Sequence, residues 1–363
     1  MRILIIGSSK AAEVLTNFLS EDENHLVFTT KEGTDGNFVN INQNDTDELK
    51  EFALANEINL TVVTDTALFD KNYHEIFTAS GLAILIPDNE ALKITSSKSF
   101  SKKFIYKNKI KTPRFAFFEK PIPAIEHARN SPYPIVIKPD EHSATETAYI
   151  AETFGNAKNY IEKLFQTDNK KVLIEDYIYG KEMTFYIISD GFGAIMIDYC
   201  LNYQNELSAK LTCDNKLEEK VYNEIIFPTI SNLASNGIEY TGILGFDTIV
   251  APNGEIYLIE YNPFFKDIDI ETILKSVDIN WAKLFMDTIV GTLQDNFESP
   301  FSIKRDNDFW GAFRLENGNG TDEPKSEEII VQNAKTLNLL KTKLSEEGLK
   351  QSMLDEAFKL WNL

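Results

Sequence analysis

The chain has 363 residues, 43% of them hydrophobic and 25% charged, which is typical of a globular protein with two or three domains. No run of 18 or more apolar residues occurs, so we expect no membrane partner or membrane-spanning segment, and the apolar stretch after Met1 is too short for a signal peptide. The formal net charge of −20 argues against a nucleic-acid partner. The two cysteines, Cys200 and Cys213, are too few for a disulfide framework or a thiolate metal site, so we expect a cytoplasmic protein.

The first ninety residues alternate short apolar runs with segments of helical spacing. The expected strands are Arg2–Ile6, Leu26–Thr29, Leu60–Val63 and Leu82–Ile86, and the expected helices are Ala11–Leu19, Asp47–Ala55 and Asn72–Ala79. Strands separated by helices of about ten residues predict right-handed βαβ units and a parallel sheet. Residues 1–92 are therefore predicted to form a small doubly wound domain.

Residues 93–300 are predicted to mix strands, hairpins and helices. Ser96–Lys109 is expected to be a basic helix. The expected strands are Phe115–Phe118, Ile135–Lys138, Tyr149–Ala151, Val172–Asp176, Met183–Ser189, Ala194–Cys200, Gly245–Val250 and Ile256–Tyr261. Asp190-Gly191 and Asn253-Gly254 are hairpin turn signals. Leu217–Ser235 is expected to be a helix kinked or interrupted at Pro228, and Thr272–Leu293 is expected to be helical.

The end of the chain is predicted to be a linker followed by helix. Asn317–Pro324 is polar and contains glycine, and Ser326–Leu363 is expected to be a helical tail. We expect an apolar face with Ile330, Ala334, Leu337 and Leu344 to pack on the body of the protein. The predicted organisation is a domain at residues 1–92, a second at 93–300 with a small lobe at about 114–183, and a linker with tail at 301–363.

The segment Gly242–Phe264 carries the most informative polar residues. Glu260 and Asn262 are two apart on one predicted strand, so they point to the same face. Asp247, on the partner strand, reaches that face if the register is right. Such oxygen ligands suit one or two Mg²⁺ ions that are otherwise held by phosphate groups and water. The alternative is an ordinary hairpin with outward polar side chains, although polar residues in so apolar a strand are costly to bury without partners.

Four segments carry short motifs in a fixed order. They are SSKSFSKKF (Ser96–Phe104), PIVIK (Pro134–Lys138), VLIEDYIYGKEMTFYIISDG (Val172–Gly191) and the hairpin with Asp247 and E-x-N at Glu260–Asn262. The set resembles the glycinamide ribonucleotide synthetases (phosphoribosylamine–glycine ligases) of the ATP-grasp superfamily, over roughly residues 1–300. The resemblance implies a shortened, divergent relative with an α/β and α+β fold. Its parts would be a doubly wound pre-ATP-grasp domain, a two-lobed ATP-grasp domain and a short C-terminal helical tail.

The resemblance also implies a role for each matched polar residue. The phosphates of ATP would be contacted by Lys102 and Lys138. Adenine and ribose would be bound by the hinge residues Glu175, Asp176, Tyr177 and Ile178 and by Glu182. Mg²⁺ or Mn²⁺ would be held by Asp247, Glu260 and Asn262. The catalytic lysines would be Lys138 and, as a substitute on the acceptor side, Lys210. For Lys102 an ordinary solvated lysine on a basic helix remains an equal alternative.

The sequence departs from the family at several places. The family has a glycine-rich phosphate loop where Pro139–Ala151 contains no glycine and carries Asp140, Glu141 and Glu146. Phe264 stands where the family has an arginine. The family's β-rich C-terminal domain is missing or reduced to the residues after Ser299. These departures make phosphoribosylamine doubtful as the substrate.

The leading hypothesis is an ATP-dependent carboxylate–amine ligase that acts through an acylphosphate, similar to the purine-biosynthesis enzyme. Its partners would be a small-molecule carboxylate and an amine, and it would be a monomer or homodimer. The first alternative is a non-catalytic nucleotide-binding or scaffolding protein with a degenerate site. A dinucleotide-binding protein based on Met1–Leu19 is a weaker alternative, because the second and third glycines of G-x-G-x-x-G are lacking.

Overall fold

The computed structural model describes residues 1–140, 148–167, 171–211, 214–317 and 326–361. The chain divides into two compact units. Unit 1 contains Met1–Leu92, Lys181–Asp247 and Asn262–Leu363, and unit 2 contains Lys93–Gly180 and Thr248–Tyr261. The division of the chain at residues 92 and 300 therefore stays a prediction from the sequence. Each unit is described by itself below.

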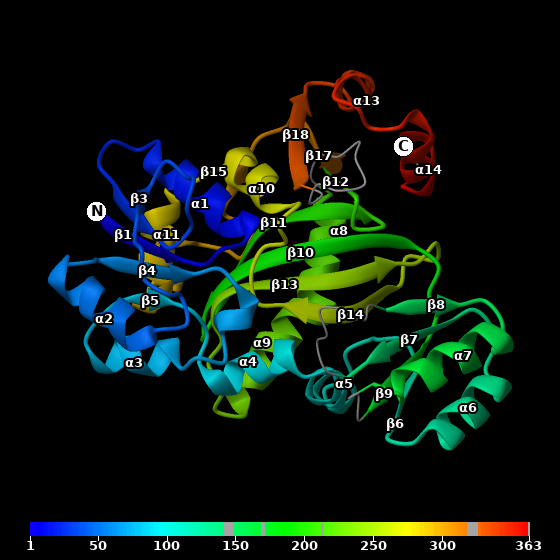
Figure 1. The fold of residues 1–363 in the computed structure, drawn as a ribbon. Coiled ribbons are helices and arrows are strands. Elements are labelled where there is room, and N and C mark those ends of the chain that lie inside the picture. Colours follow the sequence, from blue (N-terminus) through cyan, green and yellow to red (C-terminus); the bar gives the residue numbers. More distant parts are fainter. Residues whose placement is uncertain (141–147, 168–170, 212–213, 318–325, 362–363) are drawn as a thin grey trace. The chain divides into compact units, whose positions relative to one another are not determined.

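Unit 1 begins with a parallel sheet in the order β3-β2-β1-β4-β5 (Figure 1). Its strands are β1 (Arg2–Ile6), β2 (Leu26–Thr29), β3 (Asn37–Phe38), β4 (Leu60–Val63) and β5 (Ile84–Leu85). The helical elements between them are α1 (Lys10–Ser20), α2 (Thr46–Ala55), η1 (Thr66–Leu68) and α3 (Tyr73–Ala79). All pairings are parallel, which confirms the predicted doubly wound sheet. The central strands β1 and β4 are almost wholly apolar, as buried parallel strands are.

An antiparallel sheet follows in the order β14-β13-β10-β11-β12-β17-β18. Its strands are β10 (Lys181–Asp190), β11 (Ala194–Tyr203), β12 (Leu207–Lys210), β13 (Thr241–Val250), β14 (Ile256–Asn262), β17 (Phe309–Asn317) and β18 (Ser326–Ala334). The chain passes between the two units within β13 and within β14. In unit 1, one buried core joins the first sheet to this one, with Ile3, Ile197 and Phe285 among its members.

The helices of unit 1 correct two expectations. Thr272–Leu293 is not one helix, since α10 (Ile270–Ser276), α11 (Trp281–Ile289) and α12 (Leu293–Asn296) are separate. Strand β15 (Val277–Asp278) interrupts them by pairing with β16 (Lys304–Arg305), and the Asn280 side chain caps α11. The other helical region runs as α8 (Asn215–Val221), the π-helical turn η2 (Tyr222–Ile226) and α9 (Phe227–Ser235). The interruption expected at Pro228 therefore comes one turn earlier, as a π-helical turn.

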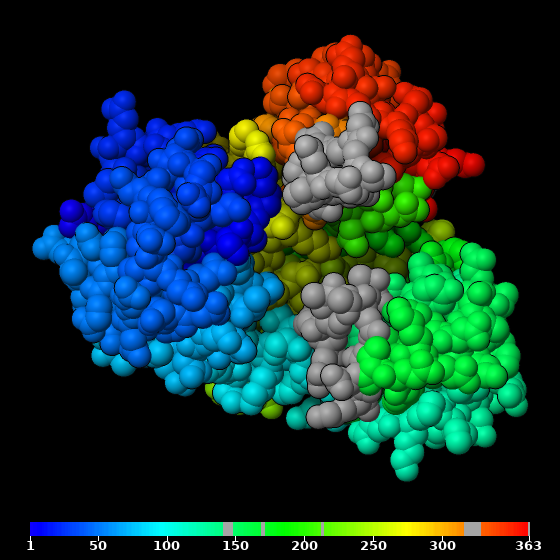
Figure 2. Space-filling model, viewed as in Figure 1, coloured from blue at the N-terminus to red at the C-terminus, as the bar shows by residue number. Residues whose placement is uncertain are grey.

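The C-terminal region also differs from a purely helical tail. Ser326–Ala334 forms β18, which pairs with β17, and the helices α13 (Leu337–Glu346) and α14 (Gln351–Leu360) come only after it. The β-branched run Ile329–Val331 favours a strand. The expectation of a packed apolar face is confirmed in part, because Ala334 and Leu344 are buried. In Figure 2 the C-terminal helices (red) lie at the surface.

Unit 2 is built on an antiparallel sheet in the order β6-β9-β7-β8. Its strands are β6 (Phe115–Phe118), β7 (Ile135–Pro139), β8 (Tyr149–Ala151) and β9 (Val172–Asp176). Helices α6 (Pro121–Asn130) and α7 (Phe154–Leu164) pack on one face through a core that includes Ala128, Ile137 and Ile161. The basic helix expected at Ser96–Lys109 is two helices, α4 (Asn89–Ser96) and α5 (Lys98–Lys107). The break lies at Ser97, whose hydroxyl accepts a hydrogen bond from Phe100 N and caps α5.

Across the described ranges, every helix is too short or too polar to cross a lipid bilayer.

Candidate functional site

Unit 2 contains a buried cluster in which one carboxylate faces two lysines. Glu175 Oε1 lies 2.5 Å from Lys102 Nζ, and Glu175 Oε2 lies 3.2 Å from Lys138 Nζ. The side chains of Lys102 and Glu175 are each 3% exposed, and that of Lys138 is 9% exposed. The solvated-lysine alternative for Lys102 is therefore wrong. Positive charge is in excess at this carboxylate.

The sheet and its neighbours position these three side chains. Glu175 on β9 stands opposite Val136 on β7, and Lys138 is two residues further along β7, so their side chains share a face. Lys102 comes from α5, and its ammonium group donates a hydrogen bond to Thr112 Oγ1 at 2.8 Å. Thr112 in turn donates to the carbonyl of Leu258 on β14 at 2.7 Å. The cluster is thus anchored to three separate elements of unit 2.

The electrostatics of the cluster favour an added anion. Burial alone would raise the pKa of Glu175, but Lys138 and Lys102 hold it below its usual value. Burial lowers the pKa of Lys102, while Glu175 opposes that change. Burial also lowers the pKa of Lys98 at the start of α5, with opposition from Glu260. A phosphate group near these lysines would favour their charged forms.

Glu260 lies at the edge of this cluster. Its Oε2 is 3.9 Å from Lys138 Nζ, and its side chain is 39% exposed. It stands on β14, which follows a tight turn of the β13–β14 hairpin in which Gly254 has φ +79°. Glu260 therefore combines a loose contact with a lysine and access to solvent, which suits a ligand-binding carboxylate.

The predicted hinge residues follow Glu175 directly. Asp176 Oδ2 lies 2.6 Å from Arg114 Nε, an ion pair at the start of β6. Tyr177 and Ile178 are partly buried, and the rings of Tyr177 and Tyr179 meet edge to face at 4.7 Å between centroids. The contact with Arg114 places the Asp176 carboxylate in an ion pair of its own, away from Lys102 and Lys138.

The predicted phosphate loop lies mostly outside the described residues. Of Pro139–Ala151, residues 141–147 are not described, so the expectations for Glu141 and Glu146 stay untested. Asp140 is described, and its Oδ1 accepts a hydrogen bond at 2.8 Å from the backbone N–H of Ser99, at the start of α5. Its other oxygen, Oδ2, lies 3.9 Å from Lys171 Nζ.

In unit 1 the predicted metal ligand Asp247 already has a cationic partner. Asp247 Oδ1 lies 2.7 Å from Lys266 Nζ and accepts a hydrogen bond from Thr184 Oγ1 at 2.6 Å. Burial would raise the pKa of Asp247, but Lys266, Thr184 and Asn262 hold it below its usual value. The predicted ribose ligand Glu182 belongs to the same sheet and stands opposite Asn202 on β11.

The residues of the predicted metal site are not equally suited to a divalent ion. The described residues contain no group of three or more acidic, histidine or cysteine side chains placed to hold a metal. Asp247 does not fit that role as it stands, because its oxygen is bonded to an ammonium group. Glu260, in unit 2, offers an accessible carboxylate that fits a hard cation shared with phosphates, whereas Asn262 belongs to unit 1 and its place in the metal site stays a prediction from the sequence.

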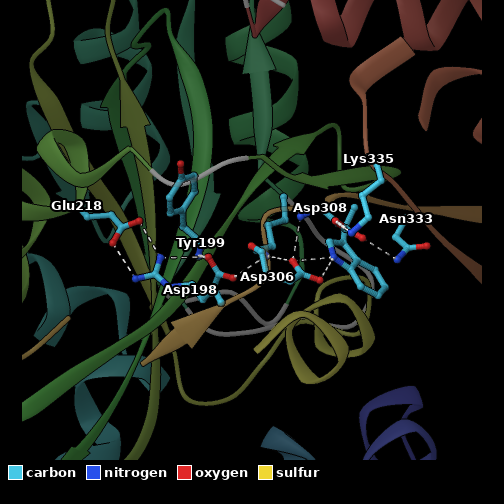
Figure 3. Close-up of polar contacts among 10 residues, drawn as sticks. Asp198, Tyr199, Glu218, Asp306, Asp308, Asn333 and Lys335 are labelled. Atoms are coloured by element: carbon cyan, nitrogen blue, oxygen red, sulfur yellow. Dashed lines mark hydrogen bonds and ion pairs between the residues drawn. The ribbon is translucent and has the colours of Figure 1, made fainter. Parts of the chain in front are cut away.

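The second predicted catalytic lysine, Lys210, lies in a different kind of cluster, of which Figure 3 labels Asp198, Glu218 and Asp306. Its Nζ is 2.8 Å from Asp306 Oδ1 and 3.7 Å from Asp198 Oδ2, and its side chain is 1% exposed. Arg305 binds Glu218 with two hydrogen bonds of 2.7 and 2.8 Å and lies 3.4 Å from Asp198. Here a buried lysine faces two carboxylates, so it supports the fold and not an anionic ligand.

Sequence reasoning missed several residues that shape these clusters. Lys266, Thr184 and Arg305 were not singled out, although each contacts a buried carboxylate. Lys266 stands four residues after Asn262 and lies outside the recognised motif. No motif in the sequence therefore pointed to it. Arg305 is distant in sequence from Glu218, and no local pattern reveals such a pair.

The chain is similar in sequence to known proteins. Residues 96–209 match the family described as phosphoribosylglycinamide synthetase, ATP-grasp (A) domain. The phosphoribosylamine–glycine ligase of Clostridium acetobutylicum is 28% identical over 84% of this chain and 77% of its own length. That of Caldanaerobacter subterraneus subsp. tengcongensis is 24% identical over 81% of this chain and 76% of its own length.

Solved structures show the same fold. The phosphoribosylamine–glycine ligase of Thermotoga maritima superposes with a TM-score of 0.75 at 17% identity, over 95% of this chain and 96% of that one. The Campylobacter jejuni biotin carboxylase gives a TM-score of 0.71 at 14% identity, over 95% of this chain and 90% of that one. The predicted fold class and the predicted enzyme class, an ATP-grasp ligase, are confirmed. The chain matches an ATP-grasp domain over residues 96–209 and is similar to the phosphoribosylamine–glycine ligases along most of its length.

Proposed function

We propose that the protein joins a small carboxylate to an amine at the expense of ATP, with an acylphosphate as intermediate. The observation that carries this proposal is the buried Lys102–Glu175–Lys138 cluster, in which two ammonium groups share one carboxylate. Such a site attracts a polyphosphate, because phosphate oxygens form strong charge-assisted contacts with buried ammonium groups. The first substrates to test are glycine and phosphoribosylamine, since they are named by the relatives.

The proposed roles combine the geometry of unit 2 with the expectations from the sequence for Glu182 and Asn262, which belong to unit 1. Lys102 and Lys138 bind phosphate oxygens, and the hinge from Glu175 to Ile178 borders the base, with Glu182 as the proposed ribose ligand. Bound Mg²⁺ would neutralise phosphate charge, with Glu260 and Asn262 as its protein ligands. Lys210 is left out of the proposed site, because Asp198 and Asp306 enclose its ammonium group.

The reaction depends on the positioning of the substrates more than on covalent catalysis by the protein. The substrate carboxylate oxygen attacks the γ-phosphorus of ATP, the bond to the β-phosphate oxygen breaks, and ADP leaves. The amine nitrogen then attacks the acyl carbon, phosphate leaves, and the nitrogen loses a proton as the amide forms. Lys138 stabilises charge that develops on the transferred phosphoryl group, and its burial strengthens that interaction by excluding water.

The test is ADP release by the purified protein with ATP, Mg²⁺, glycine and phosphoribosylamine. We expect release that requires both acid and amine, and we expect Lys138→Ala and Glu260→Ala to abolish it. Lys103→Ala is the matched control, because Lys103 is an exposed lysine on the same helix as Lys102. Amine-dependent ADP release that is unchanged in Lys138→Ala would show that the assigned site is wrong.

The second candidate function is nucleotide binding without turnover. The observations that favour it are the glycine-free stretch Pro139–Ala151 and the engagement of Asp247 by Lys266. A protein of this kind would be stabilised by ATP and would release no ADP with any acid and amine pair. ADP release that depends on an added amine excludes it.

A further inference from the structure

Asp247 and Lys266 form an ion pair in unit 1, and both also contact the Thr184 hydroxyl. Besides the 2.7 Å ion pair between them, Lys266 Nζ lies 3.1 Å from Thr184 Oγ1, which itself donates to Asp247. The side chains of Asp247 and Lys266 are 16% and 24% exposed. Asn202 Nδ2 donates to Thr184 Oγ1 at 2.8 Å, so the hydroxyl is fixed from the other side.

The backbone holds Lys266 beside a second buried carboxylate. The N–H of Lys266 donates to the Tyr186 hydroxyl at 3.2 Å, and that hydroxyl donates to Asp269 Oδ2 at 2.7 Å. Asp269 is fully buried and also accepts a hydrogen bond from Ser208 Oγ at 2.5 Å. Burial raises the pKa of Asp269, and the charge of Lys266 is the largest influence in the opposite direction. Lys266 thus forms an ion pair with the partly buried Asp247, and its charge also acts on the fully buried Asp269.

We infer that the Lys266 ammonium group takes the place of a divalent cation at Asp247. A metal bound to Asp247 Oδ1 would have to displace this ammonium group, because two cations on one oxygen repel each other. Asp247 is then a structural anion and not a ligand of the divalent cation in this chain. This inference deepens the proposed function, on which it rests for the role of the metal.

The test replaces the ammonium group by an uncharged side chain of similar length and asks whether a metal takes its place. Mn²⁺ binding is measured by electron paramagnetic resonance on the protein without nucleotide, for wild type, Lys266→Met and Lys266→Met combined with Asp247→Asn. We expect Lys266→Met to bind Mn²⁺ at least about tenfold more tightly than wild type. The double variant should return to the wild-type affinity. Lys275→Met, an exposed lysine paired with Glu271, is the control and should change nothing.

Thermal unfolding gives a second readout. In EDTA, Lys266→Met should melt below wild type, because Asp247 and Asp269 lose their shared cation, and Mn²⁺ should raise its melting temperature by at least about 3 °C. Equal Mn²⁺ affinity in wild type and Lys266→Met, or a gain that persists in the double variant, would overturn the inference.

If Lys266→Met does not fold, the Asp247→Asn variant tests the inference by itself. Its stabilisation by Mn²⁺ with ATP should equal that of wild type, and loss of that stabilisation would overturn the inference. A wild type that ATP does not stabilise would instead contradict the proposed function, and the nucleotide-free Mn²⁺ comparison would still decide the role of Lys266.

Discussion

The two buried charge clusters are opposites in composition. In unit 2 a carboxylate, Glu175, lies between Lys102 and Lys138, whereas in unit 1 a lysine, Lys210, lies between Asp198 and Asp306. Both clusters are buried, and both were expected to supply a catalytic lysine. The unit 2 cluster offers two buried ammonium groups to a bound polyphosphate, whereas the other cluster has more anions than cations around its lysine.

The difference teaches that the burial of a lysine does not by itself indicate a function. What matters is the charge that remains after the partners inside the protein have been counted. The Lys210 cluster also includes the Arg305–Glu218 pair and the Trp310 indole, which donates to Asp306 Oδ2 at 2.9 Å. Its contacts join β11, β12, α8 and the segment from β16 to β17, so we interpret it as a structural network.

The largest expected effect is the loss of protein stability when the lysine of the unit 1 cluster is removed. Lys210→Ala should destabilise the protein by about 3–5 kcal/mol, because it leaves Asp198 and Asp306 without their lysine in a buried site. Urea unfolding followed by circular dichroism measures it. A cost below about 1 kcal/mol would show that the network adapts without the lysine, and the structural interpretation would fail.

The next effect concerns ligand affinity. Lys102→Met should weaken ATP binding by at least about tenfold, because a charge-assisted contact to phosphate is lost. Lys103→Met, the exposed neighbour on α5, should leave the affinity unchanged. Fluorescence titration with a labelled ATP analogue compares the two, and equal losses would mean that only the general charge of the helix matters.

The pH dependence of stability sharpens the contrast further. Burial raises the pKa of Asp198 to about 6, even though Lys210 and Arg305 oppose the change. The ordinary value is 3.8, so the folded state binds the proton more tightly than the unfolded state does. The resulting stabilisation is complete below pH 3.8 and is lost as pH rises to about 6.

We therefore expect wild type to lose about 1 kcal/mol relative to Asp198→Asn between pH 5 and pH 7. Paired urea-unfolding curves of the two proteins at several pH values measure this difference. Parallel pH profiles for wild type and variant would contradict the assignment of the proton to Asp198.

The smallest effect lies at the rim of the same network. The Lys335 side chain is 83% exposed and lies 2.5 Å from Asp308. Lys335→Met should change stability by no more than about 0.5 kcal/mol, since exposed ion pairs contribute little. A larger loss, seen in the same urea assay, would mean that the buried and exposed parts of the network act together.

The sequence predicted much of the fold because its signals were local. The apolar runs of β1 and β4 and the turn signals at Gly191 and Gly254 set the strands and hairpins. Errors arose where a contact distant in sequence decided the outcome. Val277–Asp278 became a strand because Lys304–Arg305 pairs with it, and Ser326–Ala334 became a strand beside β17.

The candidate site, like the fold, was predicted in part from the sequence. The motifs brought forward Lys102, Lys138 and Glu175, which the fold does bring together. They could not distinguish Lys138 from Lys210, because the carboxylates around Lys210 come from segments more than ten residues away. Nor could they show that Asp247 is bonded to Lys266, since that contact depends on the course of the chain after β14.

The most direct test of the central claim is isothermal titration of a non-hydrolysable ATP analogue with Mg²⁺ into wild type and Lys138→Ala. We predict saturable binding to wild type that weakens by at least about tenfold in the variant, because Lys138 supplies one of the two ammonium groups at Glu175. Equal affinity in the two proteins, or no binding to wild type at all, would contradict the claim that this cluster is the nucleotide site.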